Sequence, residues 1–272
     1  MIDLPVPLTA SVLAACLVLL LAISAVLYRC ARGAGLGRRS ATLLAGAAGL
    51  AQAGWLAATA ALASTGLYAA ELDETIPWIG LGLGIPLVLG ILALRLPPVA
   101  ASLSHVHAPA LLAAVQAFRI EGGVFLVLLA TDRLPAGFAL PAGIGDVLVG
   151  LLAPFVAYAL WKRPQRRSLG VAFNALGLAD LLVAITAGLL LAPGPLQAIV
   201  TEPTTEIMSA LPMVLIPTFA VPLAIVLHVA SFRLLVAPAA RPAASSHGDQ
   251  AGPSPGTGRS ATSHGGVDLD QS

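Results

Sequence analysis

The sequence predicts an all-α fold, a polytopic bundle of about seven membrane-crossing helices with the N-terminus outside and the C-terminus in the cytoplasm. Three observations lead to this prediction: the composition, the length of the apolar segments, and the charges between them. Of 272 residues, 58% are hydrophobic and only 10% are charged, and the mean hydropathy is +0.92. A soluble domain carries roughly 25% charged residues, because its surface must face water. The composition therefore excludes a soluble globular or a disordered protein.

Seven apolar segments are long enough, or nearly so, to cross a bilayer. A helix needs about 20 apolar residues to span roughly 30 Å of hydrocarbon. Backbone groups in lipid must be satisfied within the segment, so each span should be helical. In chain order, the expected spans are 8–28, 41–67, 76–94, 110–130, 142–161, 169–192 and 207–232.

The loops between these segments alternate in charge. The first, third and fifth loops and the end of the last span hold Arg29, Arg32, Arg38, Arg39, Arg95, Lys162, Arg163, Arg166, Arg167, Arg233 and Arg241. The second, fourth and sixth hold Glu71, Asp73, Glu74, Asp132, Arg133, Glu202 and Glu206. Because basic loops stay in the cytoplasm, this alternation predicts the orientation and favours a multi-pass protein of the inner (plasma) membrane.

Two further segments complete the predicted organisation. Residues 99–108 are interrupted by polar side chains, and we expect a cytoplasmic loop or a short interfacial helix there. Beyond Pro238 the composition changes to Ser, Gly, Pro, Thr and Asp, which cannot bury enough apolar surface to fold. The expected domains are a transmembrane bundle, 1–238, and a disordered cytoplasmic tail, 239–272.

Four charged residues fall inside the expected spans: Arg119, Glu121, Asp146 and Asp180. Charges in the bilayer normally face other helices and pair, because exposure to lipid costs about 2.5 kcal/mol or more. Arg119 and Glu121 are two residues apart and should point to different sides, so each needs a partner on another span. At 1.5 Å per residue, we expect Asp146 in the outer third of the bilayer, about one turn from its helix start, and the other three near the midplane.

The simplest hypothesis pairs Arg119 with Asp180 or with Asp146. Gln116, one turn back, would add a hydrogen bond, and Asn174 would touch the same partner helix as Asp180. The acid left over would be protonated or would line a water-filled cavity. Glycines near these residues would let the helices approach closely. A structural bridge that fixes which helices are neighbours, a solute or proton pathway, and catalysis remain as alternatives.

Prolines and histidines give weaker candidates. Pro212, Pro217 and Pro222 should bend the last span, as a hinge or as a static bend. His105, His107 and His228 are weak candidates as metal or haem ligands, because no cysteine or carboxylate cluster accompanies them. We expect no metal and no cofactor.

The second half of the chain carries a recognisable pattern. Its residues are Gln116, Arg119, Gly122, Leu134, Pro135, Phe138, Ala139, Pro141, Ala142, Gly143, Gly145, Asp146, Gly150, Asn174, Gly177, Asp180, Leu181, Pro212, Pro217, Pro222 and His228. Over 110–235 this pattern resembles a family of uncharacterised bacterial integral membrane proteins. Phe173 stands where that family tends to have tryptophan. The resemblance implies a shared bundle and shared polar positions, and no mechanism.

The leading functional hypothesis is a small-solute or proton-linked permease that uses the polar set Gln116, Arg119, Glu121, Asp146, Asn174 and Asp180. The alternative is a non-enzymatic membrane scaffold or accessory subunit whose buried charges only fix helix packing. An enzyme is the less favoured class, because the sequence holds no zinc spacing, phosphate loop or nucleophile elbow. The expected partners are the lipid bilayer and a small molecule or proton. A net charge of +1 without a basic patch argues against nucleic acid.

Overall fold

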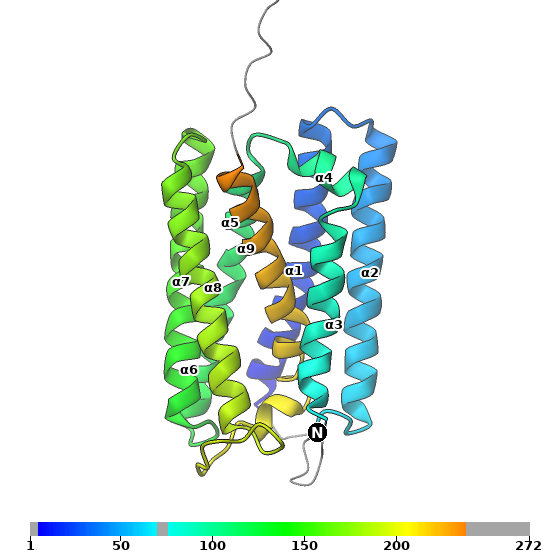
Figure 1. The fold of residues 1–272 in the computed structure, drawn as a ribbon. Coiled ribbons are helices and arrows are strands. Elements are labelled where there is room, and N and C mark those ends of the chain that lie inside the picture. Colours follow the sequence, from blue (N-terminus) through cyan, green and yellow to red (C-terminus); the bar gives the residue numbers. More distant parts are fainter. Residues whose placement is uncertain (1–4, 70–75, 238–272) are drawn as a thin grey trace, which may run out of the picture. The chain divides into compact units, whose positions relative to one another are not determined.

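The computed structural model describes residues 5–69 and 76–237, and within these ranges every regular element is a helix (Figure 1). The described helices belong to one compact unit, Met1–Ala237. Three sequence predictions lie outside the described residues: the tail at 239–272, the acidic residues Glu71, Asp73 and Glu74, and Arg241.

The first two helices are long and antiparallel. Helix α1 covers Val6–Gly33 and α2 covers Arg38–Ser64, and both match expected spans. The short connection between them places the first group of arginines at one end of the pair (Figure 1). The side of α2 that faces away from α1 has few partners, since only Ala41 and Thr59 of this helix are buried.

The third expected span is a bent pair of helices. Helix α3, Trp78–Ala93, has 16 residues, and α4, Pro97–Leu103, follows it after a bend of 75°. Leu96 is extended because the residue before a proline avoids the α region, and Pro97 and Pro98 then suit the first turn of a new helix. The expected loop or interfacial helix at 99–108 is thus helical as far as Leu103.

The fourth expected span changes its winding halfway along. It consists of α5, Ala108–Val115, a 3₁₀ segment η1, Gln116–Gly122, and α6, Gly123–Ala130. A 3₁₀ helix has three residues per turn, is tighter than an α-helix and is uncommon beyond a few residues. A seven-residue 3₁₀ segment inside a long helix therefore marks an unusual site.

Helices α7, Ala136–Lys162, and α8, Arg167–Leu191, form the second long antiparallel pair. Helix α7 begins six residues before the expected start at 142, because its turns continue through Pro141. Asp146 therefore lies ten residues into α7, and the expectation that it lies about one turn from the helix start is wrong.

The last expected span begins later than 207. A short 3₁₀ turn, η2 (Glu206–Ser209), is followed by irregular turns, a π-helical turn, η3 (Ile216–Ala220), and then α9 (Val221–Val236). Pro212 precedes the continuous helix, Pro217 lies within η3, and Pro222 lies in the first turn of α9. Proline lacks a backbone donor, so three prolines at this spacing prevent a regular α-helix before Val221.

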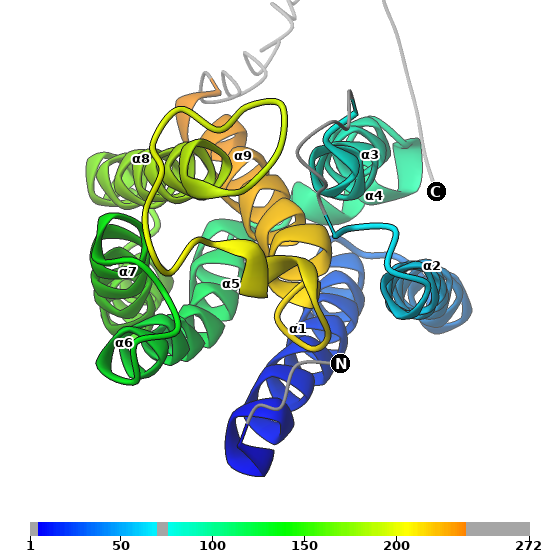
Figure 2. The same cartoon turned by 90° about the horizontal axis from the view of Figure 1, so that it is seen from below.

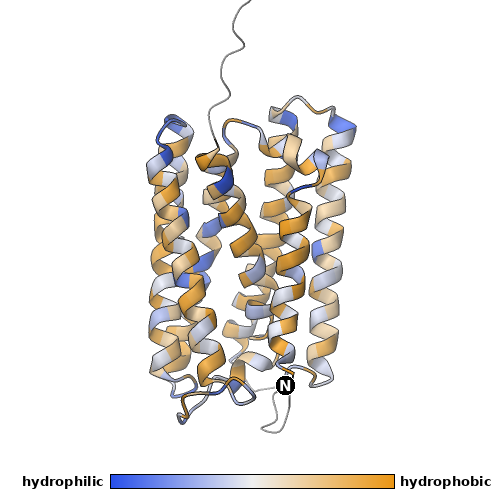
Figure 3. Cartoon of the chain, in the orientation of Figure 1, coloured by the Kyte–Doolittle hydropathy of each residue, from blue (hydrophilic) through white to orange (hydrophobic). Residues whose placement is uncertain are grey.

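Within the described ranges, six helices are long and apolar enough to cross a membrane: Val6–Gly33, Arg38–Ser64, Ala108–Ala130, Ala136–Lys162, Arg167–Leu191 and Ile216–Val236. The bent pair of α3 and α4 makes a seventh if it is counted as one span. Apolar residues extend along most of the length of these helices, and hydrophilic residues gather mainly at the two ends (Figure 3).

The basic loops gather at one end of the bundle. The α1–α2 and α7–α8 connections, α4 and the end of α9 lie at the upper end in Figure 1, with ten of the basic residues named above. The opposite end has the α6–α7 connection and the segment 192–215, with Asp132, Arg133, Glu202 and Glu206 among its described residues.

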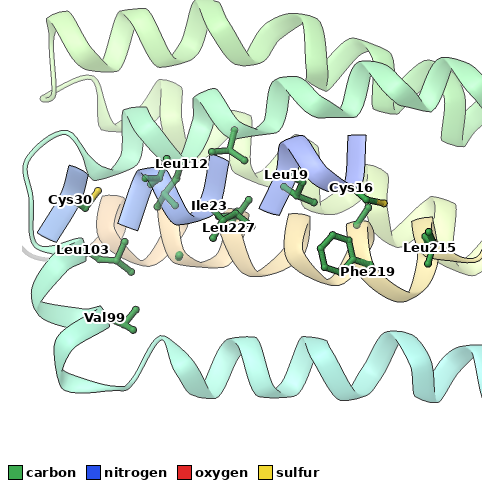
Figure 4. Close-up of a cluster of buried hydrophobic side chains, with 14 of the residues drawn as sticks. Cys16, Leu19, Ile23, Cys30, Val99, Leu103, Leu112, Leu215, Phe219 and Leu227 are labelled. Atoms are coloured by element: carbon green, nitrogen blue, oxygen red, sulfur yellow. The ribbon is translucent and has the colours of Figure 1, made fainter. Parts of the chain in front are cut away.

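Helix α9 lies in the middle of the bundle (Figure 2). It packs against α8 and α5 on one side and against α3 on the other. An apolar seam between α1, α4, α5, η3 and α9 fills the space beside it (Figure 4). The labelled residues of this apolar seam are Cys16, Leu19, Ile23, Cys30, Val99, Leu103, Leu112, Leu215, Phe219 and Leu227.

Candidate functional site

Arg119 is at the centre of the most polar region inside the bundle. It lies in η1, where three residues per turn place Gln116, Arg119 and Gly122 on one face, and all three are buried. The guanidinium is only 2% exposed. The change from α to 3₁₀ winding thus gives this segment a straight polar face directed at the neighbouring helices.

Two aspartates share the Arg119 guanidinium. Asp146 Oδ1, from α7, lies 2.6 Å from both Nε and Nη2, and Asp180 Oδ2, from α8, accepts a hydrogen bond from Nη2. The sequence left open which of the two acids would pair with Arg119, and the structure places both against it. Charge-assisted bonds of this kind are about twice as strong as neutral ones and fix the geometry of the planar guanidinium.

His228 extends the set onto α9. Arg119 Nη1 donates to the carbonyl oxygen of Gly177 at 3.3 Å and lies 3.4 Å from His228 Nε2. His228 Nδ1 is 2.9 Å from Asn174 Oδ1, which can only accept, so Nδ1 carries the proton and Nε2 is free to accept from Arg119. We call Arg119, Asp146, Asp180, Asn174 and His228 the Arg119 cluster.

Asn174 is itself oriented by two acceptors. Its Nδ2 donates to the Gly170 carbonyl at 2.8 Å and to Ser231 Oγ at 2.9 Å. A carbonyl oxygen cannot donate, so these bonds fix which end of the amide faces His228. The hydrogen bonds therefore run in one direction from Arg119 through the imidazole to the amide and then to α9.

Gln116 has a different partner from the one expected. Its Nε2 donates to the Ala224 carbonyl on α9 at 3.1 Å, and its buried Oε1 has no partner among the described residues. It therefore joins η1 to α9 and does not add a hydrogen bond to an arginine–aspartate pair. A carbonyl buried without a partner is costly, which makes this atom a candidate water or ligand contact.

Glycines make room for the Arg119 cluster. A Cβ atom built at Gly145 would overlap the Asp180 carboxylate, one at Gly122 would overlap Asp146, and one at Gly177 would overlap the His228 ring. The small residues near the charges in the sequence thus lie where polar side chains of one helix reach the backbone of another.

Glu121 is not bonded to the Arg119 cluster in the described part of the chain. It is partly buried and makes no ion pair with any described residue, so the expected partner on a neighbouring span is not found there. With Arg119, Asp146 and Cys16, it lines a small cavity of about 40 Å³ beside α1.

A larger cavity of about 230 Å³ is also lined by Asp146. Residues of α3, α6, α7 and α8, the segment 192–209, η3 and the first residue of α9 line it, and nearly all of them are apolar. The Asp146 side chain is 15% exposed, compared with 2% for Arg119. Asp146 is therefore the member of the Arg119 cluster through which the buried charges contact this larger cavity.

The formal charges inside the bundle do not balance. Among the described residues, Arg119 is the one cation in contact with Asp146 and Asp180, and Glu121 adds a third carboxylate nearby. If all of these groups were ionised, the site would carry a net charge of −2. Two carboxylates thus share one base, and the excess negative charge favours a further positive charge at the site.

The other sequence candidates are placed as follows. The rings of His105 and His107 lie 5.5 Å apart, between α4 and α5, and His107 stacks on Trp161. The three candidate histidines are not together, and no group of metal-ligand residues forms within the described ranges. His228 binds Arg119 instead, a role that sequence reasoning missed. A signal was available in the spacing. Asn174 and Gly177 are three residues apart, as are His228 and Ser231, so each pair lies on one face of its helix.

Sequence reasoning also missed a contact made by Trp55. Because Pro222 has no N–H, it cannot donate to the carbonyl of Thr218 four residues earlier. Trp55 Nε1, from α2, donates to that carbonyl at 2.8 Å. Pro222, one of the three candidate hinge prolines, thus leaves the Thr218 carbonyl without its helical donor. Helix α2 supplies the donor instead, as a buried carbonyl requires.

These features define an all-helical protein with a bundle able to cross a membrane and a buried arginine shared by two aspartates. The chain belongs to a family described as a domain of unknown function, DUF8737, which matches residues 76–236, more than half of the chain. The matched segment begins just before α3 and includes the whole Arg119 cluster. No curated protein and no solved structure matches the chain.

Proposed function

We propose that the protein is a multi-pass integral membrane protein of the inner membrane, with the arginine-rich end in the cytoplasm. The apolar length of its helices and the collection of basic loops at one end support this orientation. Single cysteines introduced at Arg39 and at Glu206, in a background lacking Cys16 and Cys30, test it with a membrane-impermeant thiol reagent on intact cells. The reagent should label the Glu206 variant and not the Arg39 variant. The reverse pattern contradicts the orientation.

Within the membrane, the function that we propose is a small-solute or proton-linked permease. The observation that carries this proposal is that Asp146 both binds Arg119 and lines the larger cavity. The polar set is Gln116, Arg119, Glu121, Asp146, Asn174 and Asp180. A proton or a solute in the cavity thus meets a carboxylate whose partner is already shared with a second acid.

The proposed steps follow from the sharing of Arg119 by Asp146 and Asp180. When Asp146 takes up a proton, it loses its charge, and Arg119 keeps Asp180 as its only carboxylate partner. Arg119 belongs to η1, so a shift of its side chain acts on the 3₁₀ segment, and the π-turn before α9 faces the same small cavity. A 3₁₀ stretch inside a helix often marks a functional hinge, and π turns often occur at functional sites.

Uptake into liposomes that contain a pH-sensitive dye tests the proposal. Purified protein should acidify or alkalinise the lumen when a panel of small solutes is offered with a pH gradient. Asp146→Asn, Asp180→Asn and Arg119→Gln should each abolish the coupled signal. Asp132→Asn, the same change at an exposed carboxylate, should not affect it. Uptake that the three buried variants leave unchanged contradicts the proposal.

One observation favours the alternative, a scaffold or accessory subunit. All three nitrogens of Arg119 have partners, and the group is almost fully buried, as in a purely structural bridge. A scaffold role predicts that Arg119, Asp146 and Asp180 can together be replaced by apolar or amide residues with the fold and its complexes retained. A permease role predicts that the same triple variant folds and does not transport.

A further inference from the structure

The larger cavity is lined by aromatic as well as aliphatic side chains. Four aromatic residues line it, Tyr68, Trp78, Phe125 and Phe138, and they come from four different parts of the chain. The rings of Phe125 and Phe138 pack edge to face, with centroids 5.2 Å apart. Small residues of α8, including Ala184 and Gly188, complete the wall and leave the space open.

Asp146 is the only formally charged residue in this lining, as far as the described residues show. Asp146 is already bonded to Arg119, and Asp180 is bonded to the same arginine. Two carboxylates therefore share one base next to the cavity. An anion would be repelled by this excess of negative charge. A divalent metal ion would need about six oxygen ligands, and the cavity offers one carboxylate.

We propose that the cavity binds an apolar organic monocation, of the quaternary ammonium or alkylammonium class. This proposal rests on the permease function above and names its substrate class. Aromatic faces attract such cations, and the attraction is greatest where water is excluded. The alkyl groups would contact the apolar walls, and the positive charge would offset the excess negative charge that reaches the cavity through Asp146.

The cavity volume restricts the size of the cation. At about 230 Å³, it lies below the range of roughly 300–1,000 Å³ typical of sites for drug-sized ligands. A compact cation such as tetraethylammonium suits this space better than a large aromatic dye. Its charge is permanent, so its binding does not depend on the protonation of the ligand.

Calorimetric titration of tetraethylammonium into the full-length protein in lipid nanodiscs tests the proposal. Asp146→Asn should weaken binding by at least about tenfold, because it removes the one negative charge that lines the cavity beside the cation. Asp180→Asn should cause a smaller loss, because Asp180 does not line the cavity. Asp132→Asn should bind like the unchanged protein. Ala184→Leu keeps every charge and fills the cavity, so it should abolish binding.

Three results of this titration would overturn the proposal. They are no binding by the unchanged protein, unchanged binding by Ala184→Leu, or a loss in Asp180→Asn as large as in Asp146→Asn. Displacement of tetraethylammonium by its uncharged isostere 3,3-diethylpentane at equal concentration would also overturn it, because the site would then accept any apolar group, including a lipid chain. If proton-linked uptake of another solute persists while tetraethylammonium does not bind, only the substrate class is wrong. If tetraethylammonium binds and no variant alters any flux, the permease function is wrong.

Discussion

The Arg119 cluster and the apolar seam are both buried in the bundle, and they stabilise it in different ways. In the seam, side chains such as Leu19 and Phe219 contact many neighbours, and no contact depends on direction (Figure 4). In the Arg119 cluster each nitrogen of the guanidinium has its own acceptor, and each acceptor comes from a different place on α7, α8 or α9. The stability of the seam therefore depends on the volume of its side chains. The stability of the Arg119 cluster depends on particular donor and acceptor atoms.

The family match covers the whole Arg119 cluster and most of the apolar seam. It includes α3 to α9 and every member of the Arg119 cluster, whereas α1 and α2 lie outside it. Helix α1 contributes Cys16, Leu19, Ile23 and Cys30 to the seam. Helix α1 therefore adds apolar packing from outside the matched segment, and every member of the Arg119 cluster lies within it.

The largest effect is expected from Arg119→Met. This change leaves Asp146 and Asp180 buried together without a cation, which should cost about 3–5 kcal/mol of folding free energy. Thermal unfolding of the purified protein in detergent, followed by circular dichroism, measures the loss. The triple variant Arg119→Met, Asp146→Asn, Asp180→Asn should recover most of it. A triple variant no more stable than the single one would contradict this account of the Arg119 cluster.

A smaller effect is expected from one added methyl group. Gly145→Ala would place a Cβ atom on the Asp180 carboxylate and should destabilise the bundle by about 1–3 kcal/mol. Gly54→Ala in α2 is the matched control, because nothing lies within 4 Å of its Cβ position. It should be neutral or stabilising by up to about 1 kcal/mol. Equal melting temperatures for the two variants would refute the close approach of α7 and α8 at Gly145.

Trp55→Phe should cost about 1–2 kcal/mol. It removes the donor to the Thr218 carbonyl, which Pro222 leaves unpaired, and keeps most of the aromatic volume. Trp55 belongs to α2, outside the matched segment, so this variant tests whether a specific polar contact also holds the N-terminal helices. Slower hydrogen exchange around η3 in the variant than in the unchanged protein would contradict the role assigned to the indole.

The smallest effect is expected from Leu19→Met in the apolar seam. Leu19 is fully buried, and a change that conserves volume should cost no more than about 1 kcal/mol. Asp180→Asn conserves volume just as well within the Arg119 cluster, so the two variants compare the regions directly. The same unfolding measurement should give a clearly larger loss for Asp180→Asn. A larger loss for Leu19→Met would reverse the comparison.

The sequence by itself determined the class of fold and the identity of the buried charges. Apolar length is a property of each segment alone, so the expected spans agree closely with most of the helices. The low charge content likewise made Arg119, Asp146 and Asp180 conspicuous, because few charged residues lie inside apolar segments. The late start of the last helix was missed, because three prolines act on backbone hydrogen bonds that composition does not measure.

Only the tertiary structure decided how these residues combine. The 3₁₀ winding of η1 brings Gln116 and Arg119 onto one face, and the early start of α7 moves Asp146 to the middle of its helix. The sharing of one arginine by two aspartates, the role of His228 and the cavity beside Asp146 depend on helices that are far apart in the chain. Local sequence does not encode such relations, since they arise from how whole helices pack, from the depth at which each side chain lies, and from which glycines let two backbones approach.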